Sequence, residues 1–190
     1  MNIGVIKTSL KKNEKRLPIY PPHLCFIDIE VRNSIILESG YGLDFKLTDY
    51  DLENMGYTIK NRGDIFFESD LIILPKPTDQ DLDKMKPNQI LWGWTHCVQN
   101  KEIAQYAIDK KLTYISWENM NLWQGDTKLL HIFYKNNEIA GYSSVLHVLQ
   151  LMGMDGYYDE NKKVIVFGYG SVSKGSIRAL YGRGFKDITV

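Results

Sequence analysis

Residues 164–190 read VIVFGYGSVSKGSIRALYGRGFKDITV, which predicts a buried strand, a glycine-rich turn, an amphipathic helix and the start of a second strand. Gly168 allows a tight exit from the strand, and Gly170 lets the backbone approach a phosphate group. The helix that begins near Ser171 directs its N-terminal amides and the positive end of its dipole toward that phosphate. The residues that we expect to bind the pyrophosphate of a dinucleotide are Gly168, Gly170, Ser171, Val172 and Ser173.

This glycine pattern leaves an alternative open, a simple strand-to-helix turn, because Ser173 stands at its third glycine position. Gly175 offers a second point at which the helix could pack closely on the strand. The residue that reads the ribose normally comes about 20 residues after the first glycine, which is at or just past Val190. The residues alone therefore do not separate NAD from NADP, and we expect a truncated site that binds a dinucleotide weakly or not at all.

Composition narrows the class of protein. Of the 190 residues 44% are hydrophobic and 24% are charged, which is typical of one or two globular domains. Lys plus Arg and Asp plus Glu both number 23, so no net charge favours nucleic acid or an anionic membrane. The apolar runs are too short for a membrane span, and the two cysteines form no disulfide framework or CxxC pair. We expect a soluble, cytoplasmic protein whose partners are small molecules.

Short apolar runs alternate with helical patterns, which indicates parallel strands joined by helices. Pro22 to Ser39 is predicted as a helix followed by Gly40, residues 124–128 as a turn or linker, residues 138–153 as a helix buried on most sides, and residues 153–163 as a loop. The predicted fold is α/β: a Rossmann-like parallel-sheet substrate domain over residues 1–128, then a linker helix and the beginning of a second, dinucleotide-binding Rossmann domain over residues 129–190. The strand candidates are NIGVI at 2–6, LIIL at 71–74, QILWGW at 89–94, LTYISW at 112–117 and VIVF at 164–167.

Three residues near strand ends suit a small carboxylate substrate. Arg16 carries a planar guanidinium that can bind a carboxylate through two hydrogen bonds. Lys76 follows the strand LIIL, between two prolines, and could hold the oxygen of a 2-oxo acid. His96 follows QILWGWT, and its ordinary pKa suits proton transfer near neutrality. Taken one at a time, each also fits a solvated or structural role; together they come to one edge of an open sheet, where such folds bind ligands.

The other histidines, His23, His131 and His147, fit structural roles. No pair of histidines with a carboxylate has the spacing of metal ligands, so we predict no metal.

These segments resemble the alanine dehydrogenase and pyridine nucleotide transhydrogenase family over essentially the whole chain. IGVIKTSLKKNEKRLPIYP is similar to the opening segment that carries the family's substrate arginine, here Arg16. ILPKP resembles the substrate lysine segment at Lys76, QILWGWTH the catalytic histidine segment at His96, and SWENM the segment before the domain crossover. WGWTHCVQ and GYGSVSKGS look most like the opine-type branch of the family, the carboxyethyl-ornithine synthases.

The resemblance implies an NADP-dependent oxidoreductase, with NAD not excluded, that condenses an amino-acid amine such as that of ornithine with pyruvate and reduces the imine. It assigns pyruvate binding to Arg16 and Lys76 and proton donation to His96. The strands predicted in the incomplete second domain have unpaired edges, so we expect a homo-oligomer or a completing chain. Two alternatives stay open. One is an alanine dehydrogenase, in which ammonia replaces the larger amine; the other is a non-catalytic binding or assembly module.

Overall fold

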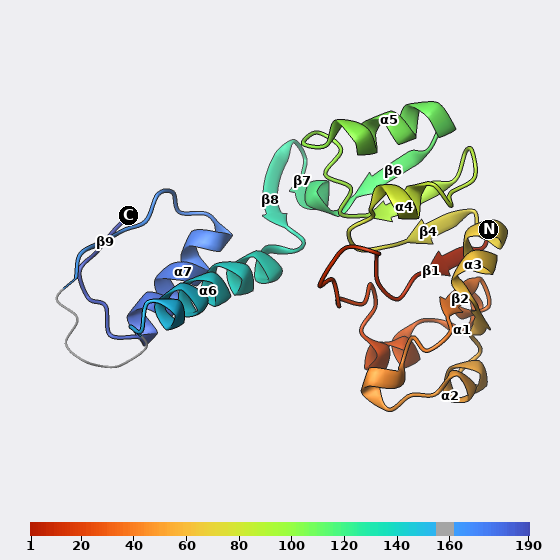
Figure 1. Ribbon diagram of the computed structural model, residues 1–190, viewed down its shortest axis with the longest axis horizontal. Coiled ribbons are helices and arrows are strands. Elements are labelled where there is room, and N and C mark those ends of the chain that lie inside the picture. The colour runs from red at the N-terminus through yellow and green to blue at the C-terminus, as the bar shows by residue number, and fades with distance from the viewer. Residues whose placement is uncertain (155–161) are drawn as a thin grey trace. The chain divides into compact units, whose positions relative to one another are not determined.

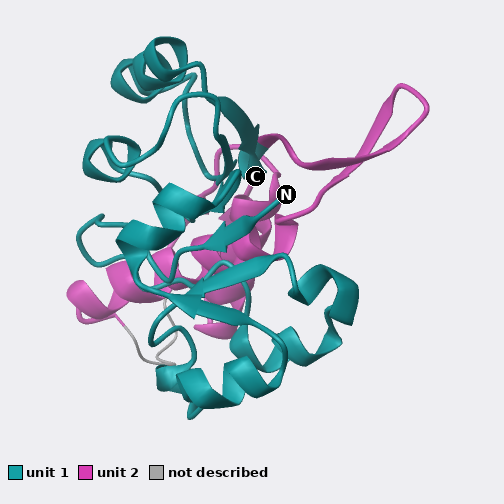
Figure 2. Cartoon of the chain, turned by 90° about the vertical axis from the view of Figure 1, so that its right-hand side faces the viewer, with its two compact units in different colours: residues 1–118 teal, residues 119–190 magenta. Residues whose placement is uncertain are grey.

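The computed structural model describes residues 1–154 and 162–190, and the chain divides into two compact units, residues 1–118 and 119–190 (Figures 1 and 2). Compact units are not the same as domains, so the domain boundary that the sequence places near residue 128 stays a prediction. Most of the loop predicted over residues 153–163 lies outside the described residues.

Unit 1 is built on a six-stranded sheet in which every pair of neighbours is parallel. The strand order is β3-β2-β1-β4-β5-β6, so the sheet grows in one direction from β1 to β3 and in the other from β4 to β6. The strands are β1 (Ile3–Val5), β2 (Ile35–Glu38), β3 (Thr58–Lys60), β4 (Leu71–Ile73), β5 (Ile90–Gly93) and β6 (Thr113–Ser116). This doubly wound order confirms the predicted α/β class and puts the point of reversal between β1 and β4.

Short helices connect these strands: η1 (Pro21–Phe26), α1 (Ile29–Arg32), η2 (Leu43–Phe45), α2 (Asp49–Asn54), α3 (Arg62–Glu68), α4 (Asp79–Leu82), α5 (Lys101–Lys110) and η3 (Trp117–Asn119). Capping residues in the sequence define where several of these helices begin. Thr48 and Asp51 form a capping box on α2, and Asn100 accepts the first free amides of α5. Apolar residues of α3, α4 and α5, including Ile65, Leu82 and Ile103, form one core with buried residues of β2, β4 and β5.

The helix predicted from Pro22 to Ser39 is wrong. The segment contains η1, the single turn α1 and then strand β2, whose Ile35, Ile36 and Leu37 pair with β1. Those three residues are buried, and their strand lies between β1 and β3 in the sheet. An apolar run of this length fits a helix or a strand equally well from its pattern, and the backbone pairing with β1 decides between them.

The described part of unit 2, residues 119–154 and 162–190, contains a hairpin, two helices and a pair of parallel strands. The hairpin β7 (Asn121–Gln124) and β8 (Thr127–His131) is antiparallel, and Gly125 with φ of 56° makes its turn, which confirms the turn predicted at 124–128. The other elements are α6 (Tyr134–Leu151), β9 (Val164–Ile165), α7 (Ser171–Gly182) and β10 (Ile188–Thr189), with β9 parallel to β10. The strand, turn, helix and strand predicted over residues 164–190 are therefore present. The first strand is not buried as predicted, because Ile165 and Phe167 are exposed.

Helix α6 is less buried than the sequence predicted. Gly141 and Leu149 are its only buried positions, and Ile139, Val148 and Leu151 are exposed. Within the described residues, no helix has both the length and the apolar character needed to cross a membrane.

Candidate functional site

The carboxyl edge of the sheet carries two of the predicted residues at the reversal between β1 and β4. Arg16 lies in the long loop after β1, and Lys76 follows β4. Burial lowers the pKa of Lys76, and the positive charges of Arg16 and Lys11 lower it further. The two cations are therefore close enough to repel each other, at the place where doubly wound sheets bind ligands.

Glu14 offsets part of this positive charge. Arg16 donates from Nε to Glu14 Oε1 at 2.8 Å and from Nη2 to Glu14 Oε2 at 2.5 Å. The Glu14 side chain is 6% exposed and that of Arg16 is 42% exposed. The Arg16 hydrogen bonds, together with the charges of Arg16 and Lys76, lower the pKa of Glu14 from 4.5 to about 2, against the opposing effect of burial. One edge of the guanidinium is thus occupied while the group still reaches solvent.

The ring of Trp94 packs against the guanidinium of Arg16. Trp94 follows β5, and the Arg16 Cζ atom lies 4.7 Å from the centroid of its ring. The Trp94 ring in turn meets Trp117 edge to face, with centroids 4.6 Å apart. The guanidinium therefore contacts both the carboxylate of Glu14 and the aromatic ring of Trp94, and these two contacts limit the orientations that it can adopt.

His96 lies at the same edge, three residues after the end of β5. It is half-buried, and its backbone has φ of 49°, in the left-handed region. Its N–H donates to Glu118 Oε1 at 2.6 Å, across from the end of β6. Because β4 and β5 are neighbours in the sheet, Lys76 and His96 emerge from adjacent strand ends.

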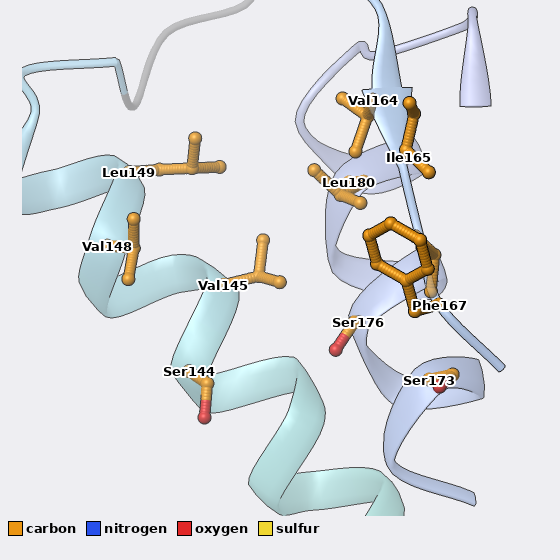
Figure 3. Close-up of a pocket in the computed structure, with 11 residues that line it drawn as sticks. Ser144, Val145, Val148, Leu149, Val164, Ile165, Phe167, Ser173, Ser176 and Leu180 are labelled. Carbon is orange, nitrogen blue, oxygen red and sulfur yellow. The ribbon is translucent and has the colours of Figure 1, made fainter. Parts of the chain in front are cut away.

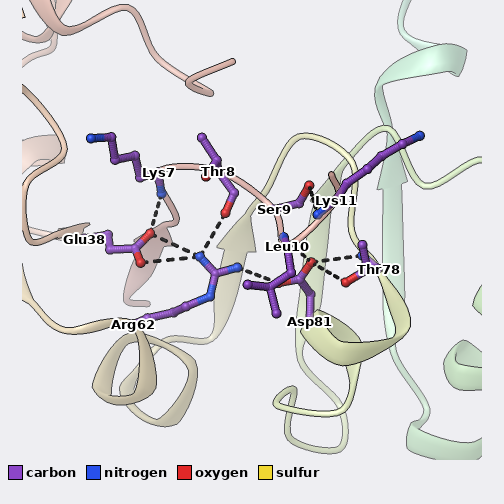
Figure 4. A network of polar contacts seen from close by, with 9 residues as sticks. All are labelled: Lys7, Thr8, Ser9, Leu10, Lys11, Glu38, Arg62, Thr78 and Asp81. Carbon is purple, nitrogen blue, oxygen red and sulfur yellow. Dashed lines mark hydrogen bonds and ion pairs between the residues drawn. The ribbon is translucent and has the colours of Figure 1, made fainter. Parts of the chain in front are cut away.

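A network of polar contacts fixes the loop that carries Arg16 (Figure 4). Glu38 Oε2 accepts the Lys7 N–H at 2.7 Å, and Asp81 Oδ2 accepts the Leu10 N–H at 3.1 Å. Arg62 joins these two carboxylates, with Nη1 at 3.3 Å from Glu38 and Nη2 at 2.5 Å from Asp81. Asp81 is fully buried, so the network ties the start of the loop to α3 and α4 from inside the protein.

The far end of this loop is fixed by Tyr41. Its buried hydroxyl accepts the Ile19 N–H and donates to the Ile19 carbonyl, both at 2.8 Å. Burial raises the pKa of this hydroxyl, which keeps it protonated as a donor. Arg16 thus belongs to a loop that is held at both ends.

The glycine turn of unit 2 suits the close approach of a phosphate. Gly168 has φ of 86°, which favours glycine, and a Cβ added at Gly168 or Gly170 would meet no atom within 4 Å. Gly170 is the N-cap of α7, and it makes no side-chain capping hydrogen bond to the first amides of the helix. These features fit a dinucleotide loop, whose backbone amides must stay open to the ligand.

Gly175 does not pack the helix on the strand as predicted. A Cβ there would lie 1.8 Å from the carbonyl oxygen of Glu138, so this glycine lets α7 approach the backbone of α6. Gly141 has the reciprocal role, because its Cβ would lie 1.9 Å from the Val172 carbonyl oxygen. Each of the two helices therefore uses a glycine to approach the backbone of the other.

A pocket of about 440 Å³ opens between α6, α7 and β9 (Figure 3). Its lining is mainly aliphatic and includes the side chains of Val145, Leu149, Ile165 and Leu180, with serine hydroxyls as its polar groups. Among the described residues, this lining has no cation to hold a carboxylate. The carboxyl edge of unit 1 therefore remains the better candidate for an anionic substrate.

Arg16, Lys76 and His96 all belong to unit 1, and residues 168–173 belong to unit 2. Three further residues, Glu14, Trp94 and Glu118, join the site through contacts that the sequence analysis did not identify. Of these contacts, only the one between Glu14 and Arg16 had a local signal in the sequence, because the two residues are two positions apart. Across residues 1–154 and 162–190, no group of three or more His, Cys, Asp or Glu residues is arranged to hold a metal.

Comparison with known protein families gives one match that covers most of the chain. The model of the family "Alanine dehydrogenase/PNT, N-terminal domain" matches residues 4–140. Among curated proteins, the N(5)-(carboxyethyl)ornithine synthase of Lactococcus lactis subsp. lactis (strain IL1403) is 29% identical, over 95% of this chain and 59% of that protein. The alanine dehydrogenase of Methanococcus maripaludis is 27% identical, over 98% of this chain and 52% of its own length.

Solved structures of other proteins share the fold, among them the following two. An L-alanine dehydrogenase superposes with a TM-score of 0.74 and 22% identity, over 97% of this chain and 53% of that chain. A transhydrogenase from Sinorhizobium meliloti superposes with a TM-score of 0.71 and 16% identity, over 97% of this chain and 57% of that chain. This chain spans just over half of the length of these relatives.

Proposed function

The chain belongs to the alanine dehydrogenase/PNT family through its N-terminal domain, as its motifs predicted, and we propose that it forms the substrate-binding part of an oxidoreductase that joins pyruvate to the amine of an amino acid. The observation that carries the proposal is the pair of cations, Arg16 and Lys76, at the reversal between β1 and β4. A small dianion or a 2-oxo acid is the natural ligand of two cations at such an edge.

Arg16 holds the carboxylate of pyruvate in this proposal. Glu14 occupies Nε and one hydrogen of Nη2, which leaves the Nη1 side of the fork for the ligand. Trp94 limits the movement of the guanidinium, so less side-chain freedom is lost when pyruvate binds.

Lys76 donates to the oxo oxygen of pyruvate and so draws electron density from the carbonyl carbon. The amine nitrogen of the second substrate attacks this carbon and gives one of its protons to the carbonyl oxygen. A proton from His96 lets this oxygen leave as water, and return of the remaining amine proton to His96 gives an imine. Addition of a hydride to the imine carbon and of a proton to nitrogen yields the secondary amine. A reduced nicotinamide, when bound, supplies that hydride.

Gly168, Gly170 and the amides of Ser171, Val172 and Ser173 are the groups that would hold the dinucleotide. We propose NADP as the cofactor by likeness to the opine-type branch, with NAD as the alternative. A homo-oligomer or a completing chain is proposed for the assembled enzyme.

Similarity to an alanine dehydrogenase over 98% of the chain favours one alternative, in which ammonia takes the place of the amino acid. A turnover assay of the protein expressed from its natural gene separates the two. We expect loss of reduced nicotinamide with pyruvate plus ornithine and none with pyruvate plus ammonia. Turnover with ammonia in the absence of ornithine would establish the alternative, and pyruvate binding without any turnover would favour a binding module.

The assay needs variants that report on the site. Arg16→Gln should raise the KM for pyruvate by about 10- to 100-fold, because a charge-assisted hydrogen bond is lost. Lys12→Gln is the matched control, since Lys12 is an exposed cation of the same loop, and it should leave KM unchanged within about twofold.

A further inference from the structure

His96 has a backbone conformation that must be held by its surroundings. Its φ of 49° lies in the left-handed region, which residues with side chains adopt rarely and at a cost. The chain leaves β5 and turns toward α5 at this point, and the His96 carbonyl accepts the N–H groups of Gln99 and Asn100 at 2.9 and 3.0 Å. The turn fixes the C-terminal side of His96; its N–H needs a second partner.

Glu118 is that partner. Its Oε1 atom accepts the His96 N–H at 2.6 Å and the Thr95 hydroxyl at 3.2 Å. Hydrogen bonds from an amide to a carboxylate are among the strongest that a protein makes. The carboxylate therefore holds the peptide that leads directly into His96.

The end of β5 is fixed against the end of β6 at three successive residues. Trp94 packs edge to face on Trp117, and the hydroxyl of Thr95, which is 2% exposed, lies 2.6 Å from that of Ser116. The third contact is the one between His96 and Glu118. Of these three contacts, only the one with Glu118 involves the backbone N–H of His96, the proposed proton donor. The other two involve Trp94 and Thr95, the residues before His96.

We propose that Glu118 is the positioning residue of His96: its carboxylate holds the His96 peptide in the left-handed conformation and so sets the place from which the imidazole reaches the substrate. This inference rests on the proposed function for the role of His96. The competing explanation is that Glu118 only strengthens the junction of β5 and β6.

Amide hydrogen exchange, measured by NMR on the 190-residue chain, tests the contact without any ligand. We expect Glu118→Ala to speed exchange of the His96 amide by about 10- to 100-fold, since a hydrogen bond to a charged group is lost. Glu118→Gln keeps an acceptor oxygen and should retain most of the protection, which also guards against an alanine variant that does not fold. Ser116→Ala is the matched control: it removes the partner of Thr95 and should leave the His96 amide protected. Equal exchange of this amide in the parent and in Glu118→Ala would overturn the proposal.

A double-mutant cycle on pyruvate affinity separates positioning from simple support. His96→Ala and Glu118→Ala should each weaken binding, by about tenfold, and the double variant should bind no more weakly than His96→Ala alone, because Glu118 acts through the imidazole. Glu118→Gln should restore affinity to within about threefold of the parent. Effects that multiply in the double variant would contradict positioning.

The two measurements fail in different ways. If His96→Ala leaves pyruvate affinity unchanged, the imidazole does not contact bound pyruvate, and the exchange data still decide whether Glu118 holds the His96 peptide. If His96→Ala weakens binding while Glu118→Ala does not, the proposed function stands and the positioning role is refuted.

Discussion

The Arg16 guanidinium lies over the ring of Trp94, with Cζ 4.7 Å from the ring centroid, although the two residues come from different loops of the sheet edge. The contact places a cation of the β1 loop against the residue that follows β5, across the end of β4. It thereby joins the two sides of the reversal point into one surface.

Loss of the Trp94 ring should weaken pyruvate binding modestly. A cation–π contact at an exposed site contributes about 0.5–1 kcal/mol, so Trp94→Leu should reduce affinity about two- to fivefold in isothermal titration calorimetry. Trp94→Phe keeps an aromatic face and is the control. Equal affinities for the leucine variant and the parent would show that the stack does not order Arg16.

The pairing of Glu14 with Arg16 should make stability depend on pH in the acid range. The pKa of Glu14 is about 2 in the folded chain against an ordinary 4.5, so the stabilisation is fully present above pH 4.5 and is lost as pH falls toward 2. Because Arg16 is 42% exposed and water screens the pair, we expect about 1 kcal/mol. Urea unfolding at several pH values should show this slope in the parent and a smaller one in Glu14→Gln. An unchanged slope in the variant would exclude Glu14 as its source.

The charge of Lys76 should set an alkaline limit on pyruvate binding. Burial and the nearby cations Arg16 and Lys11 lower the pKa of Lys76, so the ammonium loses its proton at a lower pH than an ordinary lysine. Affinity should fall as pH rises through this lowered pKa, and Lys76→Arg, which stays charged, should remove that fall. Calorimetry of both proteins across the alkaline range checks it. The same pH dependence in the arginine variant would assign the limit to another group.

Two ion pairs of unit 1 should differ greatly in their effect on stability. Arg62→Met leaves the fully buried carboxylate of Asp81 without its cation and should lower the free energy of unfolding by about 3–5 kcal/mol. Lys60→Met breaks the pair with Glu68, whose side chain is 36% exposed, and should cost at most about 1 kcal/mol. Chemical denaturation of the two variants compares them directly. Similar losses would mean that the network around Arg62 is not the anchor of the β1 loop.

Two glycines of α7 should respond in opposite ways to alanine. Gly175→Ala puts a methyl group against the Glu138 carbonyl and should destabilise unit 2 by about 1–3 kcal/mol. Gly182→Ala meets no atom within 4 Å and should stabilise the helix by about 0.5–1 kcal/mol. Thermal unfolding followed by circular dichroism measures both. Destabilisation by the second variant of the same size as the first would contradict the assignment of the Gly175→Ala loss to close packing of α6 and α7.

The sequence predicted those parts of the structure that depend on short-range patterns. The strands at Ile3–Val5, Leu71–Ile73 and Ile90–Gly93 and the glycine turn at Gly168 have local signals, and their order already indicated a parallel sheet. Strand β2 was missed because its apolar run suits a helix until its pairing with β1 is known.

The candidate site likewise has parts that short-range patterns predict and parts that depend on long-range contacts. Arg16, Lys76 and His96 could be chosen by residue type and by their places after strands. The contact of Arg16 with Trp94 and that of His96 with Glu118 join residues 78 and 22 positions apart, and each depends on how a loop returns to the sheet edge. No local pattern in the sequence reports such contacts.

An NMR titration of the 190-residue chain with pyruvate tests the central claim most directly. We predict that the side-chain signals of Arg16, Lys76 and His96 shift together, with one dissociation constant, and that Arg16→Gln weakens the constant reported by the other two residues. Shifts confined to other parts of the chain, or different constants for the three residues, would contradict a single pyruvate site at the carboxyl edge of the sheet.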